Sequence, residues 1–567
     1  MTIFYAPFQS LRNITWRSMT CSSTAFANTT ALGRARAAVA AIAVALLAAC
    51  GGGGGGEAPA ASPSANTNPG ATTDPLAPPA TCTPPQVSLL PYTTPQANLP
   101  AASTLANQCQ ADCTGTLETE KSWLRSHFND TYLWYKDVPQ VDPAPFTAAS
   151  YSNSSYRALN AYLQALKTPK ITASGKKVDQ FSFTLPTADL VSQQSGVATG
   201  YGIRFTVISN VVPRIFRVLF VEPGSPAEGA GILRGDTVRS VDGVSVDDNT
   251  TEGRATLNAG LSPRVASKVT VFGMQAPSTP AGTPASTPRL ITVTSSRSIT
   301  VTPVPTSTTL TQGTSTVGYL VLNSFSVFSA EKQLIDAVTQ LKAANINELV
   351  LDLRYNGGGF LDISNELAYM IGDGNLSGKV YEKINCNDKN PFAICNTQST
   401  FRATSRGFAP QSEVVALPQL GLKRVFVLTS ASTCSASESL INGLSPFMTV
   451  VRIGSGTCGK PYGFYYASNC GTSYAAMQFS GQNSVGFGDY ADGFAPTCQV
   501  GDDLSKPRGD ASERMLSAAL GYISTGACPT SSTGLQKSTV SVLDTGNYRV
   551  MRSPVEEQRW LGGPAAP

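Results

Sequence analysis

The chain has 567 residues, enough for about three domains of the usual size. Its 41 basic and 37 acidic side chains give a formal charge of +4, and four of the basic residues fall within the first thirty-six positions. The rest of the chain therefore balances 37 charges of each sign. This balance gives no indication of a basic face for nucleic acid.

The N-terminal segment has the features of an export signal. Four arginines and no acidic residue precede the apolar run 37–49, which is too short to span a bilayer. The run ends in Leu-Ala-Ala-Cys, which resembles the lipobox of bacterial lipoproteins and implies lipidation of Cys50. A simple secretory signal with an incidental cysteine is the alternative. We expect an exported lipoprotein facing the periplasm or the cell surface, in the outer membrane of a Gram-negative bacterium.

Cysteine usage agrees with export. Twelve cysteines are present, and setting aside Cys21 and Cys50 leaves ten, an even number. Disulfides are expected, with Cys386–Cys395 and Cys470–Cys498 as candidate pairs, although spacing does not determine connectivity. The sequence holds a single histidine, so no zinc-type spacing exists and no metal site is predicted.

Composition and periodicity divide the chain into regions. Residues 51–107 are mainly Gly, Ala, Pro, Thr and Ser, which predicts a tether without a core. Apolar residues at helical spacing predict core-forming helices at 117–135 and 156–166. Short strands are then predicted at 203–208, 215–221, 237–241 and 269–272. From residue 316 strands and helices alternate, which indicates an α/β domain.

The run Glu222–Gly243, E-P-G-S-P-A-E-G-A-G-I-L-R-G-D-T-V-R-S-V-D-G, resembles the PDZ domain. Gly200, Tyr201, Gly202 and Ile203 fall where PDZ domains keep their carboxylate-binding loop. Glycines there allow consecutive N–H groups to converge on a terminal carboxylate, while the edge of the following strand pairs with the peptide. An ordinary β-turn is the alternative.

Two residues suit hydrolytic chemistry. Ser435 lies in T-C-S-A-S-E, and Lys460 lies in G-T-C-G-K, twenty-five positions later. A serine nucleophile needs a base, and His127 lies far upstream in a predicted helix, so lysine is the obvious replacement. A glycine-rich turn, 356–359, follows the predicted buried strand 348–353.

The segments V-L-D-L-R-Y-N-G-G-G, S-A-S-E and G-T-C-G-K, placed after a PDZ-like region, resemble the carboxyl-terminal processing, or tail-specific, serine peptidases. The resemblance covers about residues 116–530. It implies that Ser435 is the nucleophile, Lys460 the base, and the amides of Ala436 and Gly358 the oxyanion hole. Lys460 must be uncharged to accept the hydroxyl proton, which burial favours.

One position departs from the family pattern. Many members carry a glutamine four residues after the lysine, where this chain has Phe464, and Gln478 is a hypothetical replacement that would orient the base. Cys434 and Cys458 flank the two catalytic candidates, and we hypothesise a disulfide between them, with free thiols as the alternative. Asp352, Arg354 and Glu438 are interpreted as structural supports.

These observations predict a multidomain α/β protein with an N-terminal helical segment, a PDZ-like β-rich domain and a crotonase-like α/β catalytic domain. The expected division is a lipoprotein-type signal peptide at 1–49, a lipid anchor and disordered linker at 50–115, an N-terminal helical domain at 116–190, a PDZ domain at 191–300, a peptidase domain at 301–530 and a flexible tail at 531–567.

The expected activity is that of a serine endopeptidase that recognises protein C-termini and hydrolyses peptide bonds through an acyl-enzyme. No cofactor is expected. The expected partners are proteins or peptides with free C-termini, and a membrane through the lipid anchor. Two alternatives remain: a catalytically silent PDZ adaptor that binds peptides, and a Ser-Lys amidase or esterase for small molecules.

Overall fold

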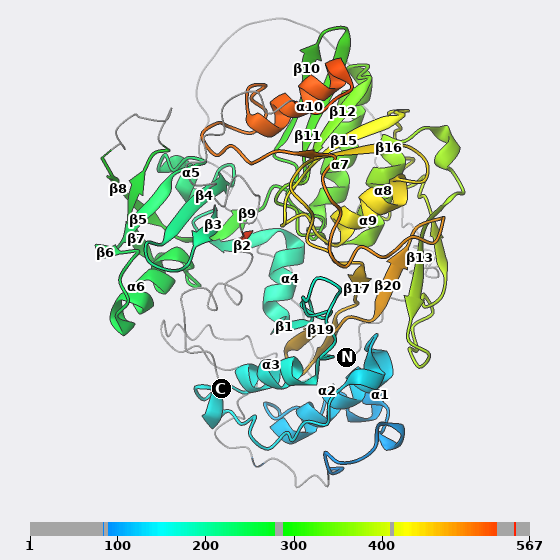
Figure 1. Ribbon diagram of the computed structural model, residues 1–567. Coiled ribbons are helices and arrows are strands. Elements are labelled where there is room, and N and C mark those ends of the chain that lie inside the picture. The colour runs from blue at the N-terminus through cyan, green and yellow to red at the C-terminus, as the bar shows by residue number, and fades with distance from the viewer. Residues whose placement is uncertain (1–82, 84–88, 278–286, 409–412, 530–548, 551–567) are drawn as a thin grey trace, which may run out of the picture. The chain divides into compact units, whose positions relative to one another are not determined.

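The computed structural model describes residue 83 and residues 89–277, 287–408, 413–529 and 549–550 (Figure 1). The predicted signal, Cys50 and most of the predicted linker and tail lie outside these residues. None of the helices in the described ranges combines the length and the apolar character that a membrane span requires.

The predicted peptidase domain is built on a six-stranded sheet. Its strands follow in the order β10 (Thr306–Gln312), β11 (Ser315–Val321), β12 (Glu348–Asp352), β15 (Arg424–Thr429), β16 (Thr449–Gly454) and β21 (Cys498–Gln499). All neighbours are parallel except β10 and β11. Every residue of β12 is buried, as expected of a parallel strand that is covered on both faces.

Helices cover both faces of this sheet. Residues of α7 (Ser329–Ala343), α8 (Leu361–Ile371) and α9 (Ala436–Leu444) share a core with Leu349 and Leu351, whereas α10 (Arg514–Thr525) packs with Val350 of the same strand. Alternate residues of the strand therefore face the two layers. The predicted alternation of strands and helices is confirmed, and α10 is an element that the sequence reasoning missed.

The PDZ region contains an antiparallel sheet. Its main path runs β22 (Arg549–Val550), β3 (Ile203–Ser209), β4 (Ile215–Val221), β5 (Thr237–Val241), β7 (Val269–Gln275) and β8 (Arg289–Thr294), and β6 (Val244–Ser245) pairs with β5. The helices α5 (Pro226–Gly229) and α6 (Thr251–Leu261) contribute Ala227 and Leu257 to its core. The four strands predicted here are confirmed.

The N-terminal region is helical. α2 (Leu117–Thr131) begins with a capping box between Thr116 and Thr119, and α3 (Ser155–Leu166) follows. Their aromatic residues pack into a core with residues near 474–477, as predicted from their spacing. His127 is buried in α2 against Trp123, and burial lowers its pKa to about 4.

Smaller elements complete the described part. They are α1 (Ala102–Leu105), β1 (Phe183–Pro186), α4 (Thr187–Ser195), β2 (Val197–Gly200), β9 (Ser296–Thr300), β13 (Val380–Cys386), β14 (Gln398–Thr400), β17 (Tyr462–Gly463), β18 (Ala467–Asn469), β19 (Thr472–Ala475) and β20 (Phe479–Gln482), with short 3₁₀ turns at Gln96–Asn98, Tyr135–Asp137, Ala149–Tyr151 and Gly374–Leu376. β13, β14, β17 and β20 form one sheet, in which β20 lies between β13 and β17. β17 begins two residues after the candidate lysine.

Disulfides link distant segments. The structure pairs Cys386 with Cys395 and Cys434 with Cys458, which confirms one predicted pair and the hypothesised bridge beside the catalytic candidates. The predicted Cys470–Cys498 pair is wrong, because Cys470 bonds to Cys109 and Cys498 to Cys528. Cys470 and Cys498 are close in sequence but do not bond, because the fold places a different cysteine next to each of them.

Candidate active site

Ser435 lies between a buried strand and a buried helix. β15 ends at Thr429, and α9 begins directly after the serine. Ser435 has a φ of 55°, a left-handed conformation that is strained for a residue with a side chain. The preceding loop is tied to the neighbouring strand end, because Thr433 Oγ1 donates to Leu353 O at 2.8 Å and Cys434 N donates to Asn356 O at 3.1 Å. The serine is therefore held at a helix N-terminus, where a developing negative charge is stabilised.

Glu438 joins the serine segment to the lysine segment. Its Oε2 accepts from Ser435 N at 3.0 Å and from Lys460 N at 2.8 Å. Its Oε1 accepts from Thr457 Oγ1 at 2.5 Å and from Gly459 N at 2.9 Å. The backbone nitrogens of Ser435 and Lys460 can thus be no farther apart than two hydrogen bonds laid end to end. Burial raises the pKa of Glu438 above its ordinary value, although these hydrogen bonds pull it down.

Replacing Glu438 by glutamine is expected to lower kcat about tenfold or more while leaving KM nearly unchanged. An amide keeps the shape but offers one acceptor oxygen, so one pair of donors faces an NH₂ group. Steady-state kinetics checks this. Glu331→Gln is the matched control, because Glu331 is equally buried and accepts three backbone amides from Arg406 to Phe408. Equal losses of kcat in both variants would contradict a positioning role for Glu438.

The side chain of Lys460 is half-buried and lies against aromatic rings. Its Nζ is 4.8 Å from the ring centre of Phe464 and 5.4 Å from that of Phe181. Phe464, which stands where many family members have glutamine, therefore contacts the amine with its ring. Aromatic faces attract a cation, whereas exclusion of water favours the neutral amine.

Gln478 is buried next to the segment that follows the lysine. Its N–H donates to Gly463 O at 2.9 Å, and its Oε1 accepts from Tyr465 N at 2.8 Å. Its Nε2 is buried and has no hydrogen-bond partner among the described residues. The hypothesis that Gln478 orients Lys460 stays a prediction. The structure attaches Gln478 to the chain three and five residues beyond the lysine.

The glycine turn packs directly on the serine. Gly358 has a φ of 98°, and a Cβ on it would lie 2.7 Å from Ser435 Cβ and 2.9 Å from Ala436 N. Only glycine fits this approach. Its own N–H donates to Asn356 Oδ1 at 2.9 Å, so the predicted oxyanion donor is engaged within the turn in this structure. The pairing of Gly358 with Ala436 as oxyanion donors stays a prediction, and it requires this hydrogen bond to open.

Arg354 holds the start of the glycine turn through a buried network of hydrogen bonds. The fully buried guanidinium donates to Asp352 Oδ1 at 3.0 Å, to Asp502 Oδ1 at 2.7 Å and to Glu513 at 2.9 and 3.0 Å. Burial raises the pKa of Asp352, but the positive charges of Arg354 and Arg508 and the hydrogen bonds from Arg354 and Tyr319 together hold that pKa below its ordinary value. The interpretation of Asp352 and Arg354 as a structural pair is confirmed.

Arg234, from the loop between α5 and β5, reaches the same network. It donates to Asp502 Oδ1 at 2.8 Å, to Tyr355 OH at 2.5 Å and to Leu219 O at 2.8 Å. Tyr355 adjoins the glycine turn, and its hydroxyl also donates to Asp502. The sequence reasoning missed Arg234 as a functional candidate, although the R-G-D run in which it lies was interpreted as part of the PDZ pattern.

Replacing Arg234 by alanine is expected to lower peptidase kcat about tenfold, because Asp502 and Tyr355 lose the cation that joins them to the PDZ region. Turnover of one unstructured protein substrate by both proteins measures this. Arg239→Ala is the control, since Arg239 is an exposed PDZ arginine that donates to Gln275. An Arg234→Ala rate equal to that of the control would refute coupling through this side chain.

The glycines of the predicted PDZ loop 200–203 have positive φ angles. Gly200 and Gly202 have φ values of 144° and 83°, and a Cβ on Gly202 would lie 2.2 Å from Ser225 Cβ. Tyr201 is buried, with its hydroxyl donating to Thr270 Oγ1 at 2.6 Å, and β3 begins at Ile203. The loop therefore lies at the start of a strand, as a carboxylate-binding loop requires.

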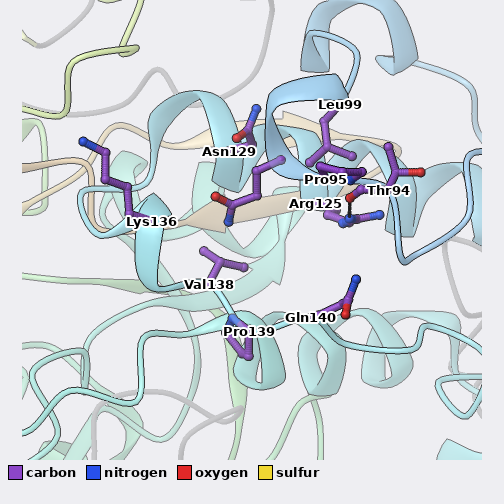
Figure 2. A pocket seen from close by; sticks show the side chains of 10 residues that line it. Thr94, Pro95, Leu99, Arg125, Asn129, Lys136, Val138, Pro139 and Gln140 are labelled. Carbon is purple, nitrogen blue, oxygen red and sulfur yellow. Dashed lines mark hydrogen bonds between the residues drawn. The ribbon is translucent and has the colours of Figure 1, made fainter.

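A separate pocket of about 150 Å³ lies in the N-terminal region (Figure 2). Its lining includes Thr94, Arg125, Asn129 and Lys136, and Arg125 donates to Thr94 O. None of the catalytic or PDZ candidates lines it. The pocket therefore shares no residue with the site around Ser435.

A serine at a strained helix start, a lysine tied to it through one carboxylate, and a glycine turn packed on the serine define a candidate Ser-Lys hydrolase site. Family models match the chain in three places: Peptidase S41 N-terminal domain at 119–183, PDZ domain at 217–257 and Peptidase family S41 at 316–463. The chain therefore carries peptidase S41 family domains on both sides of a PDZ domain.

Two named carboxyl-terminal-processing peptidases are similar to this chain. The chain is 29% identical over 266 residues to the carboxyl-terminal-processing protease of Picosynechococcus, covering 47% of this chain and 55% of the relative. It is 28% identical over 278 residues to carboxyl-terminal-processing peptidase 2, chloroplastic, of Arabidopsis thaliana, covering 48% and 47%. These matches span about half of each relative. A crystal structure of a Bacteroides fragilis protein assigned to the S41 proteases is 26% identical with a TM-score of 0.55, covering 71% of this chain and 97% of that one.

Proposed function

We propose that this chain is a serine endopeptidase that binds the C-terminal end of a protein at the PDZ loop 200–203 and hydrolyses peptide bonds at Ser435. The observation that carries the proposal is the attachment of the backbone amides of Ser435 and Lys460 to one buried carboxylate oxygen of Glu438. The S41 and PDZ matches and the names of the relatives support it.

In the proposed reaction, neutral Lys460 takes the hydroxyl proton as Ser435 Oγ attacks the scissile carbonyl carbon. The amide of Ala436 donates a hydrogen bond to the tetrahedral oxyanion. The amide of Gly358 donates a second one after its hydrogen bond to Asn356 has opened. The C–N bond then breaks, and the leaving amine takes the proton from Lys460. Water then attacks the resulting ester as the same lysine takes its proton. The bond from the acyl carbon to Ser435 Oγ breaks, and the lysine returns the proton to Oγ.

The resemblance to tail-specific peptidases suggests how the Gly358 amide becomes available. In this proposal, peptide binding to the PDZ domain shifts the active site from a misaligned to an aligned arrangement. The bond from Gly358 N to Asn356 Oδ1 marks the misaligned arrangement. Arg234, which contacts Asp502 and Tyr355, provides a physical connection between the two regions.

The proposed location is that of an exported lipoprotein, anchored through Cys50 and facing the periplasm or the cell surface. The arginine-rich start and the apolar run that ends in Leu-Ala-Ala-Cys support it. The disulfides between described cysteines also support an oxidising compartment. Incorporation of labelled palmitate into the full chain, and its loss in Cys50→Ala, is the test.

The peptidase proposal is tested with an unstructured protein reporter incubated with wild type and Ser435→Ala. We expect cleavage by the wild type and a loss of at least about a thousand-fold in the variant. Amidating the C-terminus of the reporter should slow the wild type, because the PDZ loop loses its charged partner. Equal, negligible cleavage by both proteins would indicate the adaptor. Equal rates on both reporters would contradict recognition of the C-terminus and leave the hydrolase.

A further inference from the structure

The edge of β3 that a peptide would use is paired with a strand from the end of the described chain. β4 lies on one side of β3, and β22 lies on the other, so that β22 begins the strand order of this sheet. The pairing is antiparallel, with Arg549 opposite Val207 and Val550 opposite Thr206. Two residues from the far C-terminal region therefore add a strand to the PDZ sheet.

The direction of β22 matches that expected of a bound peptide. A peptide that adds to β3 and ends at the loop 200–203 must run antiparallel to β3, toward its first residue, Ile203. From Arg549 to Val550 the partner changes from Val207 to Thr206, which is the same direction. The segment thus runs along the edge toward the carboxylate-binding loop, as a substrate end would.

β22 nevertheless differs from a substrate end in one chemical respect. Val550 is followed by further residues, so the segment carries no α-carboxylate where it pairs. It can use the main-chain hydrogen bonds of the strand edge, but it brings no chain end of its own to the N–H groups of the loop. A protein C-terminus can use both, and this additional contact favours the incoming end over the internal segment.

We propose that residues 549–550 act as an internal competitor that covers the peptide-binding edge of the PDZ domain until a substrate C-terminus displaces them. This inference rests on the proposed recognition of C-termini by that domain. Because the competitor belongs to the same chain, its effective concentration is independent of enzyme concentration. A segment that covers the edge in about nine of ten molecules weakens peptide binding about tenfold. Only ends that bind well would then engage the peptidase.

The test uses the full chain in a Ser435→Ala background, so that the probe is not cleaved. Arg549→Pro/Val550→Pro removes both N–H donors from β22, and Lys537→Pro/Ser538→Pro is the matched control in the same tail. The probe is a fluorescein-labelled decapeptide with a free C-terminal carboxylate, and its amidated form measures dependence on that charge. Fluorescence anisotropy gives the dissociation constants.

We expect the β22 variant to bind the carboxylate probe about three- to tenfold more tightly than the parent, and the control variant to bind like the parent. Equal affinity in all three proteins, with preference for the carboxylate retained, overturns the internal competitor and leaves the proposed recognition intact. Binding of neither probe by any protein overturns both.

Hydrogen exchange checks that the variant acts through the strand edge. In the β22 variant the amides of β3 that face β22 should exchange at least about threefold faster, while protection of β4 and β5 stays as in the parent and shows that the domain is folded. Saturating carboxylate peptide should restore the protection. Unchanged exchange in β3 would contradict pairing with residues 549–550.

Discussion

Lys460→Arg is expected to abolish turnover, with kcat falling about 100- to 10,000-fold, the range that a general base contributes. Arginine keeps the positive charge and the contacts with the rings of Phe181 and Phe464, so the site should stay folded. Its guanidinium cannot release a proton near neutral pH and therefore cannot accept one from Ser435. Loss of turnover in this variant would show that the reaction needs a neutral amine at this position and not only a positive charge.

The pH dependence of kcat shows which protonation form of Lys460 is active. A base acts only in its unprotonated form, so wild-type kcat should rise with pH as the amine loses its proton. The arginine variant should show no such rise. Lys379→Arg, at an exposed position, is the control and should keep the wild-type profile. A wild-type rate that falls as the pH rises through this range would be inconsistent with a lysine base.

Gly358→Ala is expected to lower kcat by at least about a hundred-fold, the usual cost of losing one oxyanion donor. The added methyl would meet Ser435 Cβ at 2.7 Å and Cys434 O at 2.8 Å, at a backbone φ that disfavours alanine. Either the turn or the serine must move. Steady-state kinetics together with a thermal melt measures both the loss of activity and the cost in stability.

Gly374→Ala is the matched control for this change. Gly374 lies in the same domain, has no atom within 4 Å of an added Cβ and is not at a positive φ. It should keep wild-type kcat and melt within about a degree of the wild type. A Gly358→Ala protein with undiminished kcat would show that the turn does not approach the reacting atoms.

The candidate site was predictable where its chemistry is local in sequence. An apolar run predicts the strand before Ser435, the small polar residues after that strand predict the turn, and a second group of apolar residues at helical spacing predicts the helix. The glycine turn follows from the strand at 348–352 in the same way. α10 could also have been found, because Met515, Leu516, Ala519 and Leu520 recur at helical spacing. Local pattern was sufficient for these elements.

Contacts between distant segments were not predictable. Arg234 and Asp502 are 268 positions apart, and no single-sequence pattern links them. Cys498 was the candidate partner for Cys470, yet the actual partner, Cys109, is 361 positions away. Such features are set by tertiary packing, which periodicity and spacing do not encode.

Chemical rescue of Lys460→Ala tests the role of the lysine as base most directly. Turnover of the protein reporter is measured with added methylamine or ethylamine over a range of pH. We expect an inactive variant whose activity returns in proportion to the uncharged amine, whereas guanidine gives no rescue. Wild-type turnover in Lys460→Ala without any amine, or rescue that follows the ammonium form, would contradict a neutral lysine as the base for Ser435.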